Sequence, residues 1–248
     1  MAEFFGSTLW RVSAFERMRD ADAAAATLGG GAPTLLPTTL LADLRQIEQN
    51  AADNDVLEVM AACVRHREPA LLCLAYGTLV WPVTLFPSQL LYHSPRDADE
   101  MARASPFAQL ALISADRPGV RPPGHAMHER VGAIEKYRPL SQLFWAVALH
   151  GPRSTLLVEI RGRAAYRLAP GRAGNIPAPP GALAPAVQRL RQDAAPLRDI
   201  ARWPGMSIDR ACRLLNALYL TESLMVTRSH PLARDEPAEL RQLLRSGK

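Results

Sequence analysis

The chain has 248 residues, of which 48% are hydrophobic, so it can bury a substantial core in one large domain or in two. Its formal net charge is +5, yet Lys136 and Lys248 are its only lysines. A charge made almost wholly of arginine, in a chain rich in Ala and Pro, is as typical of biased codon usage as of a phosphate-binding surface. The charge alone therefore does not indicate nucleic-acid binding.

Nothing in the sequence predicts a membrane span or a secretory signal. No apolar run reaches the roughly 20 residues that a bilayer-crossing helix needs, and residues 1–20 mix charged with apolar side chains. We therefore expect a cytoplasmic protein that does not contact the membrane. The three cysteines form no CxxC pair and lie in apolar patterns, which predicts buried, reduced thiols at Cys63, Cys73 and Cys212.

Residues 1–37 are expected to form an N-terminal arm and a flexible linker. Residues 21–37 join an alanine run to three consecutive glycines and two prolines, which prevents a continuous helix. The triple glycine also resembles part of a phosphate-binding loop, but no Gly-Lys-Ser/Thr follows it. The linker interpretation is therefore favoured.

An α+β domain is predicted over residues 38–172. Apolar residues recur at helical spacing in 40–49 and 55–66, and residues 70–94 then change to short apolar and β-branched runs interrupted by prolines. Because proline donates no hydrogen bond to a ladder, we expect these prolines at sheet edges or bends. A further helix is predicted near 95–105, and a strand or buried helix over 107–114.

The same order of elements recurs later in the chain. A helix over 138–151 precedes two strands that we expect to meet around Arg161 and Gly162. Residues 55–87 also read as a helix followed by two strands. The recurrence indicates either a duplicated helix-plus-hairpin unit or a chance repetition of common elements.

Residues 173–182, rich in Pro, Gly and Ala, predict a linker and the main domain boundary. Three helices and a β-branched strand follow over 183–232, which is the order of a winged-helix-like domain. Ser207 is the expected N-cap of the third helix. Residues 233–248 predict a C-terminal helix that either packs on this domain or forms a dimer seam.

The third helix allows two interpretations of its polar face. Arg210, Arg213 and Asn216 have the side chains of a recognition helix, and Arg228 would add a contact from the wing. Asp209 near the helix start opposes the approach of phosphate. A face that binds protein or solvent has the same composition, so the fold alone does not decide between the two functions.

The tail "LRDIARWPGMSIDRACRLLNALYLTESLMV", preceded by a helix, a hairpin and a Pro-rich spacer, resembles bacterial signalling proteins of the PATAN type, named for the N-terminal region of a cyanobacterial phototaxis regulator. The resemblance covers residues 138–229, and 55–94 as well if the two units are a duplication. It implies an adaptor that engages receiver domains or small-GTPase regulators in bacterial signalling.

No complete catalytic or metal-binding signature is present. His125 and His128 form an HxxH, but Pro and Gly just upstream predict a loop without the further ligands of a zinc site. A GxSxG nucleophile elbow is absent from the sequence. We therefore expect no enzyme, cofactor or metal, and predict a signalling or regulatory adaptor that binds proteins. The alternative is a winged-helix DNA-binding transcriptional regulator.

Overall fold

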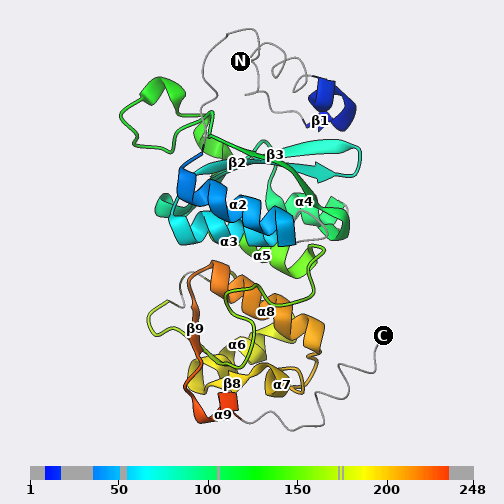
Figure 1. The fold of residues 1–248 in the computed structure, drawn as a ribbon, viewed down its shortest axis with the longest axis vertical. Coiled ribbons are helices and arrows are strands. Elements are labelled where there is room, and N and C mark those ends of the chain that lie inside the picture. The colour runs from blue at the N-terminus through cyan, green and yellow to red at the C-terminus, as the bar shows by residue number, and fades with distance from the viewer. Residues whose placement is uncertain are drawn as a thin grey trace. The chain divides into compact units, whose positions relative to one another are not determined.

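The structure, a computed structural model, describes residues 9–17, 36–50, 55–104, 107–172, 174 and 176–234 (Figure 1). It combines helices with antiparallel sheets, which confirms the predicted α+β class. The chain divides into two compact units, Met1–Arg153 and Ser154–Lys248, called unit 1 and unit 2 below. No helix in the described ranges has both the length and the apolar character needed to cross a bilayer.

Unit 1 is built on one antiparallel sheet. Its strand order is β5-β2-β3-β4-β6, and β1 pairs with the first residues of β3. The strands are β1 (Trp10–Arg11), β2 (Ala70–Tyr76), β3 (Leu79–Phe86), β4 (Leu91–His93), β5 (Ala111–Asp116) and β6 (Tyr137–Pro139). The helices are α2 (Thr38–Asn50), α3 (Val56–His66), α4 (Ala98–Ala104) and α5 (Leu140–His150), and residues 12–17 are also helical.

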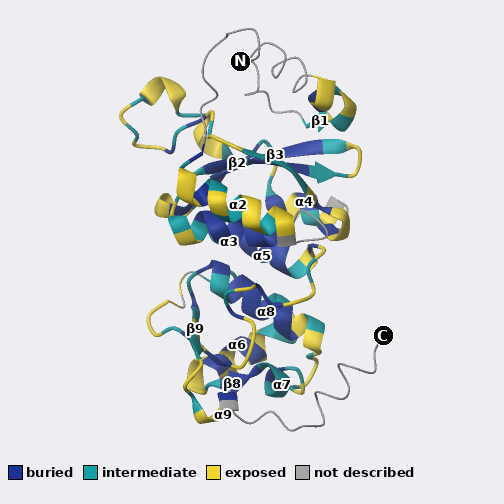
Figure 2. Cartoon of the chain, in the orientation of Figure 1, coloured by how far each residue is buried: buried dark blue, intermediate teal, exposed yellow. Residues whose placement is uncertain are grey.

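The main core of unit 1 lies on one face of this sheet. Strand alternation directs one set of side chains to that face, and its buried members include Leu72, Leu74, Trp81, Val83, Leu85 and Tyr92. Helices α2, α3 and α5 lie on the same side of the sheet in Figure 1, and Figure 2 shows α3 and α5 mostly buried. The helical residues 12–17 lie on the opposite side (Figure 1).

Pro82 shows how the sheet accommodates a proline in a central strand. It pairs with Cys73 of β2, whereas the other neighbours of β3 reach only residues 79–80 and 84–86. Proline therefore occupies the position where β3 has a strand on one side only, so no ladder hydrogen bond is lost. The Pro82 carbonyl on the open side accepts a hydrogen bond from the Ser94 hydroxyl at 3.2 Å.

Unit 2 contains a three-stranded antiparallel sheet in the order β8-β7-β9. Its strands are β7 (Ala165–Leu168), β8 (Ala195–Pro196) and β9 (Leu224–Thr227). Its helices are α6 (Leu183–Gln192), α7 (Leu197–Ile200), α8 (Ile208–Leu220) and α9 (Pro231–Arg234). Ser207 caps α8 as predicted, because its hydroxyl accepts a hydrogen bond from the Arg210 N–H at 3.2 Å.

The structure divides the chain earlier than the predicted linker at 173–182. Strand β7 lies between β8 and β9, so residues 154–172 belong to unit 2. Composition marks a surface connection, but it does not reveal which strands pair across it. The Pro-rich segment is therefore a connection within unit 2, from β7 to α6.

The predicted second helix-plus-hairpin unit is wrong. Residues 154–160 after α5 contain a bend and a turn but no strand, and β7 pairs with β8 and β9 instead. The apolar run there is buried all the same, with Leu156, Leu157 and Ile160 in the core of unit 2. A short apolar run does not by itself distinguish a strand from a buried turn.

The winged-helix assignment is not confirmed. The order α6, β8, α7, α8, β9 matches the prediction, but the central strand β7 comes from before α6. In the described residues after β9, the chain enters α9 without a returning strand, so the wing predicted around Arg228 is not formed. The predicted helix over 233–248 begins within α9, and its residues 235–248 lie outside the described ranges. Residues 18–35 of the predicted arm and linker lie outside these ranges as well.

Candidate functional site

Asn216 is a core residue of unit 2 and not part of an exposed recognition face. It is fully buried, its side-chain oxygen accepts a hydrogen bond from the Leu157 N–H at 3.0 Å, and its side-chain nitrogen donates to the Thr155 carbonyl at 2.9 Å. These bonds use the amide groups that would pair with an adenine edge. The structure therefore contradicts the predicted base contact by Asn216.

Arg210 and Arg213 are held by groups close to them in the sequence. The Arg210 guanidinium donates to the Gly205 carbonyl at 2.6 Å. Arg213 Nε lies 3.1 and 3.0 Å from the two carboxylate oxygens of Asp209, one helical turn earlier. Both arginines thus contribute to the structure of the first turns of α8, where their charge is partly balanced by Asp209.

Arg228 links β9 to the turn at residues 158–163. Its guanidinium donates to the Glu159 carbonyl at 2.8 Å and to the Arg161 carbonyl at 3.0 Å. It therefore fixes a loop and does not extend from a wing. The four residues proposed for binding do not form one exposed polar surface, because one is buried and the other three bond to their own unit.

A hollow of about 80 Å³ lies on the second face of the unit 1 sheet. Register places Leu71 opposite Thr84 and Cys73 opposite Pro82, so these four side chains point to the face that α3 and α5 do not cover. We call this cavity the unit 1 hollow; its lining residues are Trp10, Phe15, Leu71, Cys73, Val80, Pro82, Thr84, His93, Pro95, Gly119, Val120 and Lys136.

Residues near the N-terminus form part of the wall of this hollow. Phe15 is buried against Cys73 and Val80, and Trp10, Val12, Leu71 and Ile113 pack around them half-buried. Gly119 and Val120 border the hollow from the loop after β5. The second face is thus apolar, and among the described lining residues Lys136 is the one cation, at the border of the hollow.

His93 supplies a neutral polar group in the wall of the hollow. Its ring lies 4.8 Å from the Tyr137 ring, and Gly132 packs so closely that a Cβ there would lie 2.7 Å from His93 Nε2. Burial, aided by the positive charges of Lys136 and Arg138, lowers the pKa of His93 to about 4. The imidazole is therefore uncharged near neutral pH, which suits a wall that contacts apolar groups.

Tyr137 holds this arrangement together. Its hydroxyl accepts a hydrogen bond from the Gly132 N–H at 2.9 Å and donates to the Arg121 carbonyl. Burial raises the pKa of this phenol above its usual value of 10.0, so it remains a donor. The loop at 121–132 is thereby tied to β6 beside His93.

Sequence reasoning did not find the unit 1 hollow, although a signal for it exists. The β2 sequence "ALLCLAY" is apolar at successive positions, a pattern typical of a strand covered on both faces. That pattern indicates that another segment of the chain packs on the second face. It does not identify residues 10–15 as that segment, because the sequence between them and β2 gives no pairing signal.

The structure shows no metal centre among the residues that it describes. In the ranges it describes, no three His, Cys, Asp or Glu side chains are grouped as ligands. His125 of the HxxH instead accepts a hydrogen bond through Nδ1 from the Met127 N–H at 3.1 Å. The cysteines are buried and unlinked, as predicted.

Comparisons with known proteins find no matching family model, no matching curated protein and no matching solved structure.

Proposed function

We propose that this protein is a cytoplasmic bacterial regulatory adaptor of the PATAN type that binds a protein partner on the second face of the unit 1 sheet. The observation that carries the proposal is the unit 1 hollow. It is apolar, it opens on a face that the main helices leave uncovered, and its volume of about 80 Å³ matches a side chain better than a cofactor.

An apolar hollow with a cationic border suits a protein interface. Interface energy is concentrated where one partner inserts a large apolar side chain into a desolvated pocket, and charged groups around it set orientation. The partner would insert an apolar side chain against Leu71 and Val80, with an acidic residue near Lys136. The neutral imidazole of His93 permits that contact without burying a charge.

The test compares variants of the hollow with a matched surface variant. Leu71→Ser places a hydroxyl in the hollow, whereas Ile134→Ser changes a side chain that is 64% exposed elsewhere on unit 1. Each protein is used as bait in extracts of the source organism, and co-purified proteins are quantified. The proposal requires one or more proteins that bind wild type and Ile134→Ser equally and bind Leu71→Ser about tenfold less.

Two further measurements complete the test. Thermal unfolding must show that Leu71→Ser remains folded, and Lys136→Glu reverses the border charge without changing the apolar lining. A partner that binds all three variants equally would contradict the proposed site.

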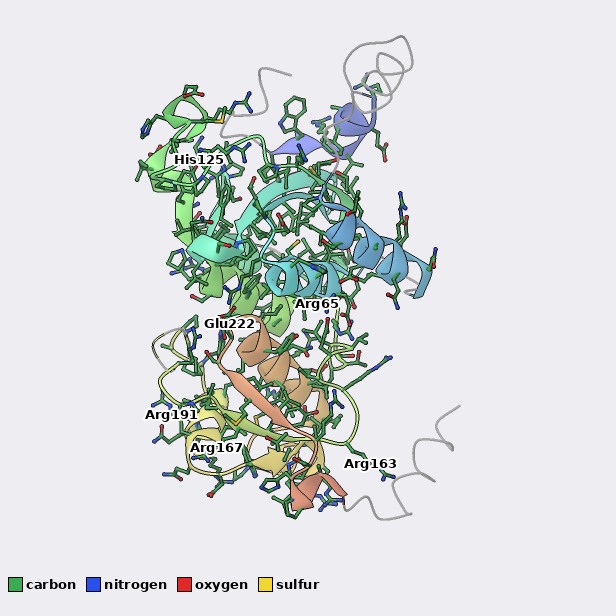
Figure 3. The ribbon with its side chains drawn as sticks, turned by 60° about the vertical axis from the view of Figure 1, so that its left-hand side comes forward. Arg65, His125, Arg163, Arg167, Arg191 and Glu222 are labelled. Carbon is green, nitrogen blue, oxygen red and sulfur yellow. The ribbon has the colours of Figure 1, made fainter. Side chains whose placement is uncertain are left out.

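The alternative, a DNA-binding regulator, is favoured by one observation. Unit 2 has fifteen Lys and Arg against eight Asp and Glu, an excess of seven positive charges, whereas unit 1 has fourteen against sixteen. Figure 3 shows Arg163, Arg167 and Arg191 of unit 2, whose exposed side chains extend from the ribbon. Fluorescence anisotropy with random duplex DNA tests this function, because phosphate contacts make binding fall steeply with salt.

A further inference from the structure

Strand β9 forms one edge of the unit 2 sheet. It pairs with β7 on one side, and no other strand of the described ranges pairs with it. The Ala169 N–H donates to the Ser223 carbonyl at 2.9 Å, and the register continues from there with Arg167 opposite Met225. Because hydrogen-bonded pairs alternate along an antiparallel ladder, Leu224 and Val226 direct their backbone groups away from β7.

A second hollow opens beside this edge. It measures about 580 Å³ and is shallow; we call it the β9 hollow, and its lining residues are Glu159, Ile160, Tyr219, Val226, Thr227, Arg228 and Ser229. Tyr219 comes from α8, and Val226 both lines the hollow and turns its backbone groups outward. The β9 hollow is therefore a recess with a mixed polar and apolar lining, which lies beside an edge strand and is bordered by a helix.

This combination is the one that recognises extended peptides. A strand added to a sheet edge gains affinity from main-chain hydrogen bonds, and alternate side chains enter recesses beside the edge. The opposite edge strand, β8, has two residues, one of which is Pro196, so it offers little pairing capacity. The β9 edge is the better site in the described part of unit 2.

The charge of unit 2 indicates the character of the peptide. The unit has an excess of seven positive charges, and Arg161, Arg163 and Arg228 are exposed beside the end of β9. Arg228 is anchored by two carbonyls through two of its five N–H donors, which fixes its charge at the border of the hollow. Glu159 also lines the hollow, and its carboxylate would repel an acidic side chain placed there. The expected ligand therefore alternates acidic with apolar residues and places its apolar side chains over the recess.

We propose that unit 2 binds an extended acidic segment of a partner protein by strand addition to β9, with apolar side chains in the β9 hollow. The site is distinct from the unit 1 hollow and its function does not depend on it. A peptide is favoured over nucleic acid because Ile160, Tyr219 and Val226 give the recess apolar surface, and the arginine in its lining, Arg228, already donates to two backbone carbonyls.

The experiment uses the full chain and a fluorescent peptide in which Asp and Val alternate. Its controls are the same peptide with Lys in place of Asp, and a version in which proline interrupts the alternation. We expect anisotropy to rise with the acidic peptide, and binding to weaken by about tenfold or more with either control. Equal binding of the acidic and basic peptides, or none at millimolar concentration, overturns the proposal.

Amide hydrogen exchange locates the peptide without altering the protein. Saturation with the acidic peptide should slow exchange at Leu224 and Val226, whose N–H groups point outward, and leave Met225 and Thr227, which bond to β7, nearly unchanged. Binding without this alternation overturns strand addition.

A variant and a competitor provide independent readouts. Val226→Pro removes an outward donor but leaves the ladder to β7, so it should abolish peptide binding. Tyr219→Ala removes an aromatic side chain from the wall of the recess but keeps the edge strand, so it should weaken peptide binding without abolishing it. If Val226→Pro does not fold, the Tyr219→Ala result and the exchange pattern still decide. Displacement of the peptide by random duplex DNA at physiological salt would assign the surface to nucleic acid and overturn the proposal.

Discussion

The side chain of Asn216 in α8 accepts a hydrogen bond from the backbone N–H of Leu157 at 3.0 Å, inside the core of unit 2. The same amide donates to the Thr155 carbonyl at 2.9 Å. One side chain thus satisfies two backbone groups of a turn that has no secondary structure of its own to do so. It joins the segment that opens unit 2 to the helix at its centre.

Asn216→Ala is predicted to destabilise unit 2 by about 1–3 kcal/mol, because it removes the acceptor of the buried Leu157 N–H. Urea unfolding followed through Trp203, the one tryptophan of unit 2, measures the change. Arg210→Ala, on the exposed side of α8, is the control and should cost under about 1 kcal/mol. Equal effects of the two substitutions would contradict a core role for Asn216.

Glu222→Gly is predicted to stabilise unit 2. Glu222 has a φ of 53° at the end of α8, where its N–H donates to the Tyr219 carbonyl and the Ser223 N–H donates to the Leu218 carbonyl. This is the Schellman arrangement, whose left-handed residue is usually glycine, so removing Cβ should raise the free energy of unfolding by up to about 1 kcal/mol.

The matched control for that substitution is Glu222→Ala. It removes the carboxylate that lies 3.5 Å from the Arg172 guanidinium but retains Cβ, so it should bring no gain. Thermal unfolding of both variants separates the backbone effect from the ion pair. A gain with alanine equal to that with glycine would show that the carboxylate, and not the backbone, is responsible.

Arg153→Ala is predicted to destabilise unit 1 by about 3 kcal/mol, because it removes a cation that is paired with the buried carboxylate of Glu58. Arg153 lies 2.8 Å from Glu58 and also bonds to Asp55, the N-cap of α3. The double variant Arg153→Met/Glu58→Gln, which removes both charges, should recover part of the loss in the same unfolding experiment. Absence of any recovery would argue against a charge effect.

Acid is predicted to destabilise unit 1 through His93. The pKa of His93 is lowered from 6.5 to about 4, chiefly by burial, so the unfolded chain binds a proton that the folded protein excludes between these values. Stability should therefore fall as the pH drops from 6.5 toward 4. The pKa of Asp43 is lowered from 3.8 by its hydrogen bond to His66, so its contribution is lost below this window.

The unfolding midpoint of wild type and of His93→Gln across that range tests the prediction. Glutamine does not titrate, so the variant should show a weaker pH dependence. Parallel curves for the two proteins would assign the acid sensitivity to other groups.

Local patterns in the sequence predicted the local elements of this fold. The helical spacing of 55–66 predicted α3, the short apolar and β-branched runs of 70–94 predicted β2 to β4, and Ser207 was correctly expected to cap α8. In each case the physical cause lies within a few residues of the element. The same information did not reveal that β7 pairs with β9, some sixty residues later.

The candidate sites required the tertiary structure for the same reason. On a helical wheel Asn216 lies with Arg213, yet the turn at 155–157 covers it and leaves the arginine partly exposed. The unit 1 hollow depends on Phe15 lying against Cys73, a contact between segments with no shared pattern. A polar side chain on a helix face is a surface residue only if no other segment packs on it.

Site-specific photocrosslinking in the source organism shows whether a protein partner occupies the unit 1 hollow. A photoreactive residue replaces Leu71 in the unit 1 hollow or, as the control, Ile134 on the exposed surface of the same unit. We expect a covalent adduct with a defined protein from position 71 and none from position 134. Equal adducts at both positions, or none at position 71 with nucleic acid recovered on the protein instead, would contradict this expectation.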